Sequence, residues 1–141
     1  MIKPSDYRKM KISTQSEVAN ICVREFFYEK REIARVFYLN VKNIVMQVTD
    51  IAVGGTNFVN VSIKEILAKA IELRANKIIL VHNHPSGDST PSKQDINFTW
   101  KLFDAGKMVE IDLIDHIVVA KDEYTSIFTN VKHNIDMYKN N

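Results

Sequence analysis

The amino-acid sequence predicts an α/β or α+β sandwich, with helices packed on one sheet. Segments that carry apolar residues at helical spacing alternate with short segments rich in β-branched and aromatic residues, which is the pattern of this fold class. The chain has 141 residues, 45% of them hydrophobic and 26% charged, which is ordinary for a globular protein with one substantial core. This composition excludes a disordered chain, a collagen-like repeat and a disulfide scaffold. The single cysteine, Cys22, cannot form an intrachain disulfide, so a reducing compartment is expected.

The first half of the chain predicts a helix, an antiparallel hairpin and a second helix. Thr14 with Glu17 and Ser62 with Glu65 fit capping boxes, in which each side chain satisfies a free backbone N–H near the other. Apolar residues recur at helical spacing after each box, whereas the segment between the boxes is β-branched and aromatic. The predicted elements are a polar lead-in over 1–14, a helix over about 15–28, strands over 33–39 and 44–53, a break at Gly54-Gly55, and a helix from Ser62 to about Arg74.

The second half predicts a buried strand, a loop, a helix and further strands. The apolar run before His82 predicts a strand, and prolines and a glycine mark the loop after it. Ser92 opens a helix whose Trp100 and Phe103 are interpreted as core. The predicted elements are a strand over 77–81 that runs into His82, a loop over 83–91, a helix from Ser92 to Ala105-Gly106, strands over 111–114 and 116–119 with Asp115 between or within them, a last strand over 124–128, and a tail or short helix over 131–141.

Charge and hydropathy limit the partners and the location. The formal net charge is +2 and no segment forms a basic arm, so the composition gives no support to binding of a nucleic-acid phosphate backbone. The N-terminus lacks the apolar region of a signal peptide. The longest apolar run, 78–81, is far shorter than the ~18–20 residues of a membrane span. We therefore expect a cytoplasmic protein that has no membrane partner.

Two histidines and a carboxylate around the predicted loop are the strongest functional signal. His82 and His84 stand two residues apart at a strand end, so they point to the same side, with Cα atoms about 6.6 Å apart at ~3.3 Å per residue. If the loop folds the helix start back over the strand end, Asp95, one turn into the helix, meets both imidazoles. Two histidines, one carboxylate and a fourth position left for water form the open ligand set of a catalytic zinc site.

Each of these residues also has a structural interpretation. A lone His-x-His pair is a weak signal, Ser92 fits an ordinary helix N-cap, and Asp95 fits a first-turn acid that complements the helix dipole. The zinc hypothesis therefore depends on their occurrence together. Asp88 also follows the histidines and is a rival carboxylate, and His116 beside Asp115 in an apolar strand is interpreted as a core pair.

This combination resembles the JAMM motif of the JAB/MPN metalloprotease family. The shared pattern is His82-Asn-His84-Pro, seven residues from Pro85 to Pro91, then Ser92, and two more residues to Asp95. Asn83 and the Pro-Ser-Gly after the histidines resemble the bacterial RadC branch. Three flanking segments do so as well: Gly54-Gly-Thr56, 76–82 and 113–118.

The resemblance covers about 15–130 and implies a fold and domain bounds. Residues 15–130 are interpreted as a RadC-like JAB/MPN domain between the lead-in over 1–14 and a polar tail over 131–141. The implied fold is an α/β (α+β) three-layer sandwich of the JAB/MPN, cytidine-deaminase-like type. Its sheet is curved, mixed and largely antiparallel, and helices flank it.

The resemblance also implies residue roles. His82, His84 and Asp95 match the ligands of one zinc ion per chain, and Ser92 matches the serine that hydrogen-bonds the oxyanion. Glu32, at the start of the first predicted strand, stands where the family has a glutamate that acts on the metal-bound water. The implied activity is hydrolysis of a peptide, isopeptide or related amide by a zinc-activated water. The sequence identifies neither the peptide or protein substrate nor the oligomeric state.

The position of the base has alternatives. Glu32 lies beside Lys30 and Arg31, so it also fits a solvated surface charge. Glu65 is the other candidate base, although its capping box already accounts for it.

Two departures from related proteins bear on function. The eukaryotic deubiquitinating members carry Ser or Thr where this chain has Asn83, and they carry insertions that grip ubiquitin. Full-length RadC proteins usually carry an N-terminal segment resembling DNA-binding helix-hairpin-helix modules, which this sequence lacks. Ubiquitin cleavage and direct DNA binding are therefore not expected. The competing functions are a DNA-repair or mobile-element accessory factor that keeps the metal without protease activity, and a scaffold that has lost catalysis, although no ligand residue is missing here.

Overall fold

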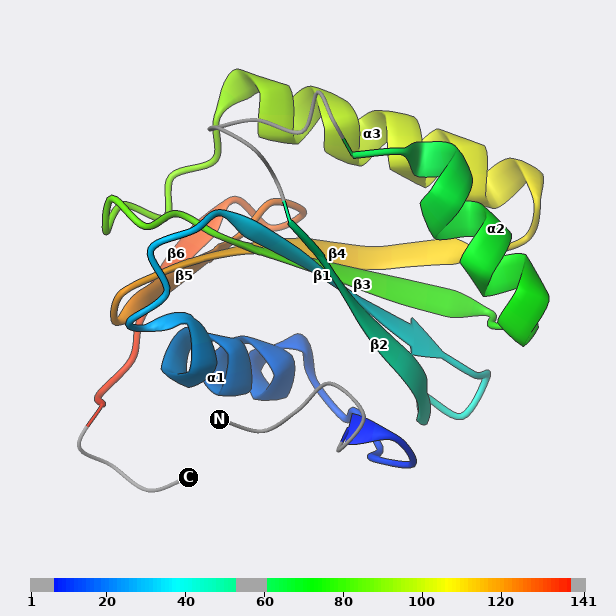
Figure 1. The fold of residues 1–141 in the computed structure, drawn as a ribbon, viewed down its shortest axis with the longest axis horizontal. Helices are drawn as coiled ribbons and strands as arrows, with labels where there is room; N and C mark the ends of the chain where they lie inside the picture. Colours follow the sequence, from blue (N-terminus) through cyan, green and yellow to red (C-terminus); the bar gives the residue numbers. More distant parts are fainter. Residues whose placement is uncertain (1–6, 53–60, 138–141) are drawn as a thin grey trace.

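One sheet lies between a helix on one face and two helices on the other (Figure 1). The structure is a computed structural model that describes residues 7–52 and 61–137. Its elements are α1 (Gln15–Phe26), β1 (Ile33–Leu39), β2 (Val45–Ala52), α2 (Ile63–Leu73), β3 (Lys77–Asn83), α3 (Lys93–Met108), β4 (Asp112–Ala120), β5 (Glu123–Ser126) and β6 (Val131–Asn134). The six strands lie in the order β2-β1-β3-β4-β5-β6; the β3–β4 pair is parallel and the other neighbours are antiparallel. The predicted α+β sandwich with a mixed, largely antiparallel sheet is confirmed.

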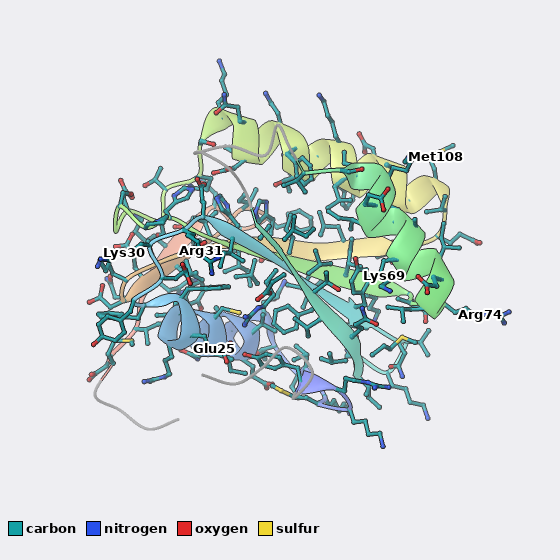
Figure 2. The ribbon with its side chains drawn as sticks, in the orientation of Figure 1. Glu25, Lys30, Arg31, Lys69, Arg74 and Met108 are labelled. Atoms are coloured by element: carbon teal, nitrogen blue, oxygen red, sulfur yellow. The ribbon has the colours of Figure 1, made fainter. Side chains whose placement is uncertain are left out.

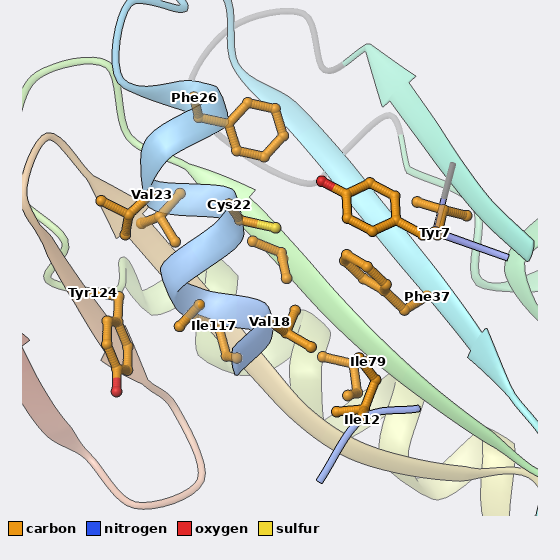
Figure 3. Packing of buried hydrophobic residues seen from close by; sticks show 14 of the residues in the cluster. Tyr7, Ile12, Val18, Cys22, Val23, Phe26, Phe37, Ile79, Ile117 and Tyr124 are labelled. Carbon is orange, nitrogen blue, oxygen red and sulfur yellow. The ribbon is translucent and has the colours of Figure 1, made fainter. Parts of the chain in front are cut away.

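α1 covers one face of the sheet with an apolar side (Figure 3). Its N-cap is Thr14, whose hydroxyl accepts the Glu17 backbone N–H at 3.4 Å, which is one half of the predicted capping box. The Glu17 carboxylate accepts the Ser13 N–H at 3.3 Å, where the capping box predicted that of Thr14. Tyr7 and Ile12 are buried in the same core, so the lead-in is not loose at these two residues. The ring of Tyr7 packs edge-on against Phe37, with centroids 5.4 Å apart. The other core residues of this layer include Val18, Ala19, Cys22, Val23 and Phe26 of α1, and Ile79, Ile117 and Tyr124 of the sheet.

A buried arginine lies within this layer. Arg35 of β1 is 1% exposed, and its guanidinium donates to both carboxylate oxygens of Asp50, at 2.6 and 2.9 Å. It also pairs with Glu25 of α1 and lies over the Phe26 ring at 4.7 Å. A buried charge is tolerated only when it is paired and hydrogen-bonded, and these contacts meet that condition.

α2 and α3 cover the other face. Ser62 and Ser92 are their N-caps, and each hydroxyl accepts the backbone N–H three residues on, at 3.1 and 3.0 Å. Because strand residues alternate between faces, β3 sends Ile79 and Val81 toward α1. Its other residues, Ile78, Leu80 and His82, therefore face the side of α3. The core of this layer includes Val36, Tyr38, Ile66, Leu67, Ala70, Ile78, Leu80, Phe98, Leu102 and Leu113.

α3 and β4 are longer than the sequence predicted. α3 continues past Gly106 to Met108, and a Cβ at Gly106 would lie 2.4 Å from the Ile111 backbone oxygen. The glycine therefore permits a close helix–chain contact rather than ending the helix. β4 is one strand with Asp115 inside it. The Asp115 carboxylate accepts the Ser126 hydroxyl at 2.5 Å and the Phe128 backbone N–H at 3.2 Å, which satisfies a buried acid.

The chain after β5 differs from the prediction. Val131–Asn134 forms β6, an edge strand paired with β5, where a tail or short helix was expected. All four residues of β6 are exposed, so backbone hydrogen bonds and not burial define it. The predicted break at Gly54-Gly55 lies outside the described residues.

Figure 2 shows residues at the two ends of the sheet. Lys30 and Arg31 lie at the end where β3 leads into the loop before α3, whereas Arg74 and Met108 lie at the opposite end. Among the helices that the structure describes, none combines the length and apolar character that a bilayer crossing requires.

Candidate metal centre

Three elements bring four donor residues together at one end of the sheet. The segment before β1 contributes Glu32, the end of β3 contributes His82, the first residue after β3 is His84, and the first turn of α3 contributes Asp95. Glu32 Oε1 lies 2.8 Å from His82 Nε2, and His84 Nε2 lies 3.2 Å from Asp95 Oδ2. His82 Nδ1 lies 3.9 Å from Asp95 Oδ1. The structure therefore places all four predicted residues within one buried cluster.

The sheet register explains why Glu32 reaches histidines 50 residues away. β1 and β3 are antiparallel, and Ala34 pairs with His82. Side chains of directly paired residues point to the same face, and so do residues two apart along a strand. Glu32 and His84, each two residues beyond this pair, are thereby directed to the face on which His82 lies.

The two histidines are held by different contacts. His84 Nδ1 donates to the Asp88 backbone oxygen at 2.9 Å, which leaves Nε2 directed at Asp95. Burial lowers the pKa of His84, but the Asp95 carboxylate, the Asp88 backbone oxygen and Glu32 together outweigh burial, so the pKa is raised. His82 is completely buried, with its ring 4.6 Å from that of His84.

Asp95 is oriented by a reciprocal capping box. Ser92 N donates to Asp95 Oδ2 at 2.8 Å, and Asp95 N donates to Ser92 Oγ at 3.0 Å. Burial raises the pKa of Asp95, but the contacts with His84 and His82 outweigh it and hold the pKa at about 2. Asp95 Oδ1 is buried and makes no hydrogen bond to any residue that the structure describes. Such an atom needs an explanation, and a bound cation is one.

The donor set fits a divalent cation. Glu32, His82 and His84 each offer one donor atom, and these atoms lie within 4.8 Å of one another. Histidine nitrogens and carboxylate oxygens are the ligands that zinc takes in open sites. Glu32 touches His82 directly and thus lies inside the donor cluster. The resemblance implied a glutamate that acts on the metal-bound water, and Glu32 lies close enough to the proposed ligands for that role.

The rival carboxylates lie elsewhere. Asp88 reaches the site only through its backbone oxygen, because its carboxylate accepts from Thr90 N at 2.9 Å and from Lys132 Nζ at 3.1 Å. Glu65 lies in the first turn of α2 beside a separate cavity that Tyr38 also lines. Neither carboxylate joins the cluster.

The cluster opens into a cleft of about 520 Å³, within the usual range of small-molecule and peptide subsites. Ser92 and Glu32 both line the cleft. The remaining lining residues are Lys30, His84, Pro85, Ser86 and Gln94.

A polar network that the sequence did not predict holds the loop before α3. Ser89 is fully buried, and both its N–H and its hydroxyl donate to Glu123 Oε2, at 2.8 and 2.7 Å. Lys132 Nζ of β6 reaches Glu123 Oε2 at 3.2 Å and Asp88 Oδ1 at 3.1 Å. The Ser89 backbone N–H is the main cause that lowers the pKa of Glu123. β5 and β6 thus support the loop that carries the His84 contact.

His116 lies behind the cluster; it is buried beside Asp115, whose Oδ1 accepts the His116 backbone N–H at 2.8 Å. Thr99 Oγ1 donates to the Asp95 backbone oxygen at 2.6 Å, so it accepts from His116 Nδ1, also at 2.6 Å. Burial lowers the pKa of His116 well below its ordinary value, which keeps the ring neutral. Its ring centroid lies 5.7 Å from that of His82. The sequence signal for this contact, a histidine in the next strand along the chain, was too general to identify it.

Comparisons with known proteins agree with this geometry. A family model described as the RadC-like JAB domain matches residues 12–133. A UPF0758 protein of Clostridium botulinum strain Hall is 44% identical over 117 residues, which is 83% of this chain and 51% of that protein. A UPF0758 protein of strain Alaska E43 is 40% identical over 120 residues, 85% of this chain and 52% of that protein. The chain spans about half the length of the curated relatives it matches.

Proposed function

The chain belongs to the RadC-like JAB domain family, and on this premise we propose that it is a zinc-dependent hydrolase of a peptide, isopeptide or related amide bond. The observation that carries the proposal is the buried convergence of Glu32, His82 and His84, with Asp95 in contact with both imidazoles. Structural cores do not normally place two carboxylates and two histidines together beside an open cleft.

The residues present fit a zinc ion. His82, His84 and Asp95 would hold it, a choice supported by the buried Asp95 Oδ1 and by the His84 ring, whose Nδ1 is already occupied. When bound, zinc supplies a Lewis acid that polarises a carbonyl and lowers the pKa of water from 15.7 to about 7. The cleft gives a substrate access to this position.

Glu32 would move the proton. Its carboxylate lines the cleft and lies next to His82, so it is placed to accept a proton from the attacking water at Oε1 and to deliver it to the leaving amine nitrogen. A neutral amine is a far better leaving group than an amide anion. Proton transfer by one carboxylate in both directions therefore serves both halves of the reaction.

Ser92 would stabilise the charge on the substrate oxygen. Its Oγ accepts the Asp95 N–H, so its own hydrogen remains to donate into the cleft that Ser92 lines. One donor of this kind contributes roughly 3–4 kcal/mol to transition-state stabilisation.

The test is a peptide-library cleavage assay with stoichiometric zinc, run on the natural chain and on Glu32→Gln. We expect cleavage that a chelator abolishes, that zinc restores, and that falls by ~10²–10⁴ in Glu32→Gln, the usual contribution of a positioned acid or base. Equal cleavage by both proteins would contradict the role of Glu32. A zinc-loaded chain that cleaves no peptide or isopeptide would favour the non-catalytic accessory function.

A further inference from the structure

Asn83, the residue between the two histidines, reaches across to β1 and binds the backbone on both sides of Glu32. Its Oδ1 accepts the Ile33 N–H at 2.6 Å, and its Nδ2 donates to the Arg31 backbone oxygen at 2.8 Å. Asn83 is only 2% exposed. The amide is thus a buried two-point clamp on the segment that carries Glu32.

The clamp lies where backbone pairing between β1 and β3 stops. The paired residues run from Leu39 with Lys77 to Ala34 with His82. Beyond that pair, the Ile33 N–H bonds the Asn83 side-chain oxygen. The Asn83 side chain therefore joins the ends of the two strands just past their last paired residues.

We propose that Asn83 is the positioning residue for Glu32, fixing both peptide groups that flank it so that its carboxylate meets the two histidines. This inference rests on the proposed function only in treating Glu32 as the base. A primary amide suits the task because it offers an acceptor and two donors on one short side chain. A serine or threonine hydroxyl has one oxygen and is shorter, and an aspartate has no donor for the Arg31 oxygen.

The contacts of the neighbouring side chains do not fix the backbone around Glu32 in the way that Asn83 does. Arg31 directs its own side chain to Glu29 at 3.0 Å, and both lie on the surface side. The Glu32 carboxylate contacts His82, and a bound metal would compete for that contact. The backbone clamp does not depend on the metal, so it holds Glu32 in both the loaded and the metal-free protein.

The test compares Asn83→Ala with Asn40→Ala. Asn40 is a matched control at the other end of β1, because it too makes two side-chain bonds to the backbone: its Oδ1 accepts the N–H groups of Lys42 at 2.9 Å and Ile44 at 3.1 Å. Three quantities are measured: amide hydrogen exchange at Ile33, the ¹³C resonance of the Glu32 carboxyl assigned with Glu32→Gln, and kcat against KM on a peptide from the library.

In Asn83→Ala we expect Ile33 exchange to accelerate at least ~10-fold and the Glu32 resonance to move toward that of solvated glutamates. We also expect kcat to fall ~10–100-fold with little change in KM, the size of effect typical of residues that orient a site. Asn40→Ala should change none of these. An unchanged Ile33 exchange rate overturns the clamp, and an unmoved Glu32 resonance overturns the positioning role.

If Asn83→Ala does not fold, Asn83→Asp provides a second test. It retains the acceptor for Ile33 and loses the donor to Arg31, so Ile33 should stay protected while the Glu32 resonance still moves; an unmoved resonance overturns the proposal. Failure of the proposed function is a separate outcome. In that case Glu32→Gln keeps its turnover or no peptide is cleaved, whereas the exchange and resonance measurements still report on Asn83.

Discussion

Glu123 holds Ser89 through both of the donors that Ser89 possesses. Glu123 Oε2 lies 2.8 Å from Ser89 N and 2.7 Å from Ser89 Oγ, and Ser89 is completely buried. The next residue back, Asp88, gives its backbone oxygen to His84 Nδ1 at 2.9 Å. Because Ser89 and Asp88 share a peptide bond, fixing Ser89 also fixes the backbone oxygen that orients the ring of His84, a proposed ligand.

The first prediction is that Glu123→Ala weakens zinc binding without touching a ligand. Loss of the Ser89 contacts should let the loop and the His84 ring reorient, and outer contacts of this kind typically contribute 10–100-fold to metal affinity. Competition with a chelator measures the affinity. Glu72→Ala is the control, because Glu72 makes only a surface contact with Lys69 at 3.3 Å. Equal zinc affinity in Glu123→Ala and Glu72→Ala would show that the Ser89 contacts do not contribute to zinc binding.

The second prediction concerns pH and the same carboxylate. The Ser89 backbone N–H, then the Ser89 hydroxyl and Lys132, lower the pKa of Glu123 below its ordinary 4.5, and they outweigh burial. A lowered folded-state pKa means that the carboxylate stabilises the fold above pH 4.5 and that this contribution is lost as the pH falls through the folded value. Glu123→Gln should therefore lower the free energy of unfolding at pH 7 and lower it less at pH 4. Urea unfolding of the metal-free protein measures both, and a difference independent of pH would contradict the assignment.

The third prediction separates the carboxylates near the histidines. Asp95→Asn and His84→Ala should lose most of the bound zinc, because each removes a donor of the buried cluster. Asp88→Asn should keep it, because the Asp88 carboxylate faces Thr90 and Lys132. Elemental analysis after gel filtration gives the zinc content per chain. Full zinc content in His84→Ala would rule out the site.

The fourth prediction separates the two duties of Ser92. Ser92 and Ser62 cap α3 and α2 with the same hydrogen bond, so Ser92→Ala and Ser62→Ala should each lower the free energy of unfolding by about 1 kcal/mol. Only Ser92 lines the cleft, so only Ser92→Ala should also slow turnover, by ~10²-fold or more if its hydroxyl serves the substrate oxygen. Thermal unfolding and a cleavage assay on both variants decide this. Matching turnover in the two variants would leave Ser92 as a cap alone.

The fold was predictable where local pattern and burial agree. β1 has the predicted bounds because all seven residues of Ile33–Leu39 are buried and six of them are apolar; the exception, Arg35, is paired with Asp50 and Glu25. β6 gave no such signal, because Val131–Asn134 is exposed throughout and exists through its pairing with β5. Tyr7 was also missed: a single aromatic residue in a polar segment has no periodicity to show that it fills the core under Phe37.

Some residues of the candidate site were likewise predictable from the sequence and others were not. His82, His84 and Asp95 lie close together in the chain, so a turn and a helix cap were enough to predict that they meet. Glu32 required the β1–β3 register, which only the resemblance to a family supplied. The grip of Asn83 on Arg31 and Ile33 was invisible because its partners are backbone groups, and backbone groups are the same in every residue.

The position of Cys22 makes the closure of α1 onto the sheet measurable in the natural chain. The only thiol of the protein lies on the buried side of that helix and is 0% exposed, and burial raises its pKa to about 12. Alkylating reagents attack the thiolate, so the closed protein excludes both the reagent and the reactive form of the sulfur. Modification must wait for α1 to lift away. The rate of alkylation therefore measures how often the α1 layer opens. This layer lies on the opposite side of the sheet from His82 and His84. Comparing the alkylation rate with and without zinc would show whether the two faces of the sheet open as one unit.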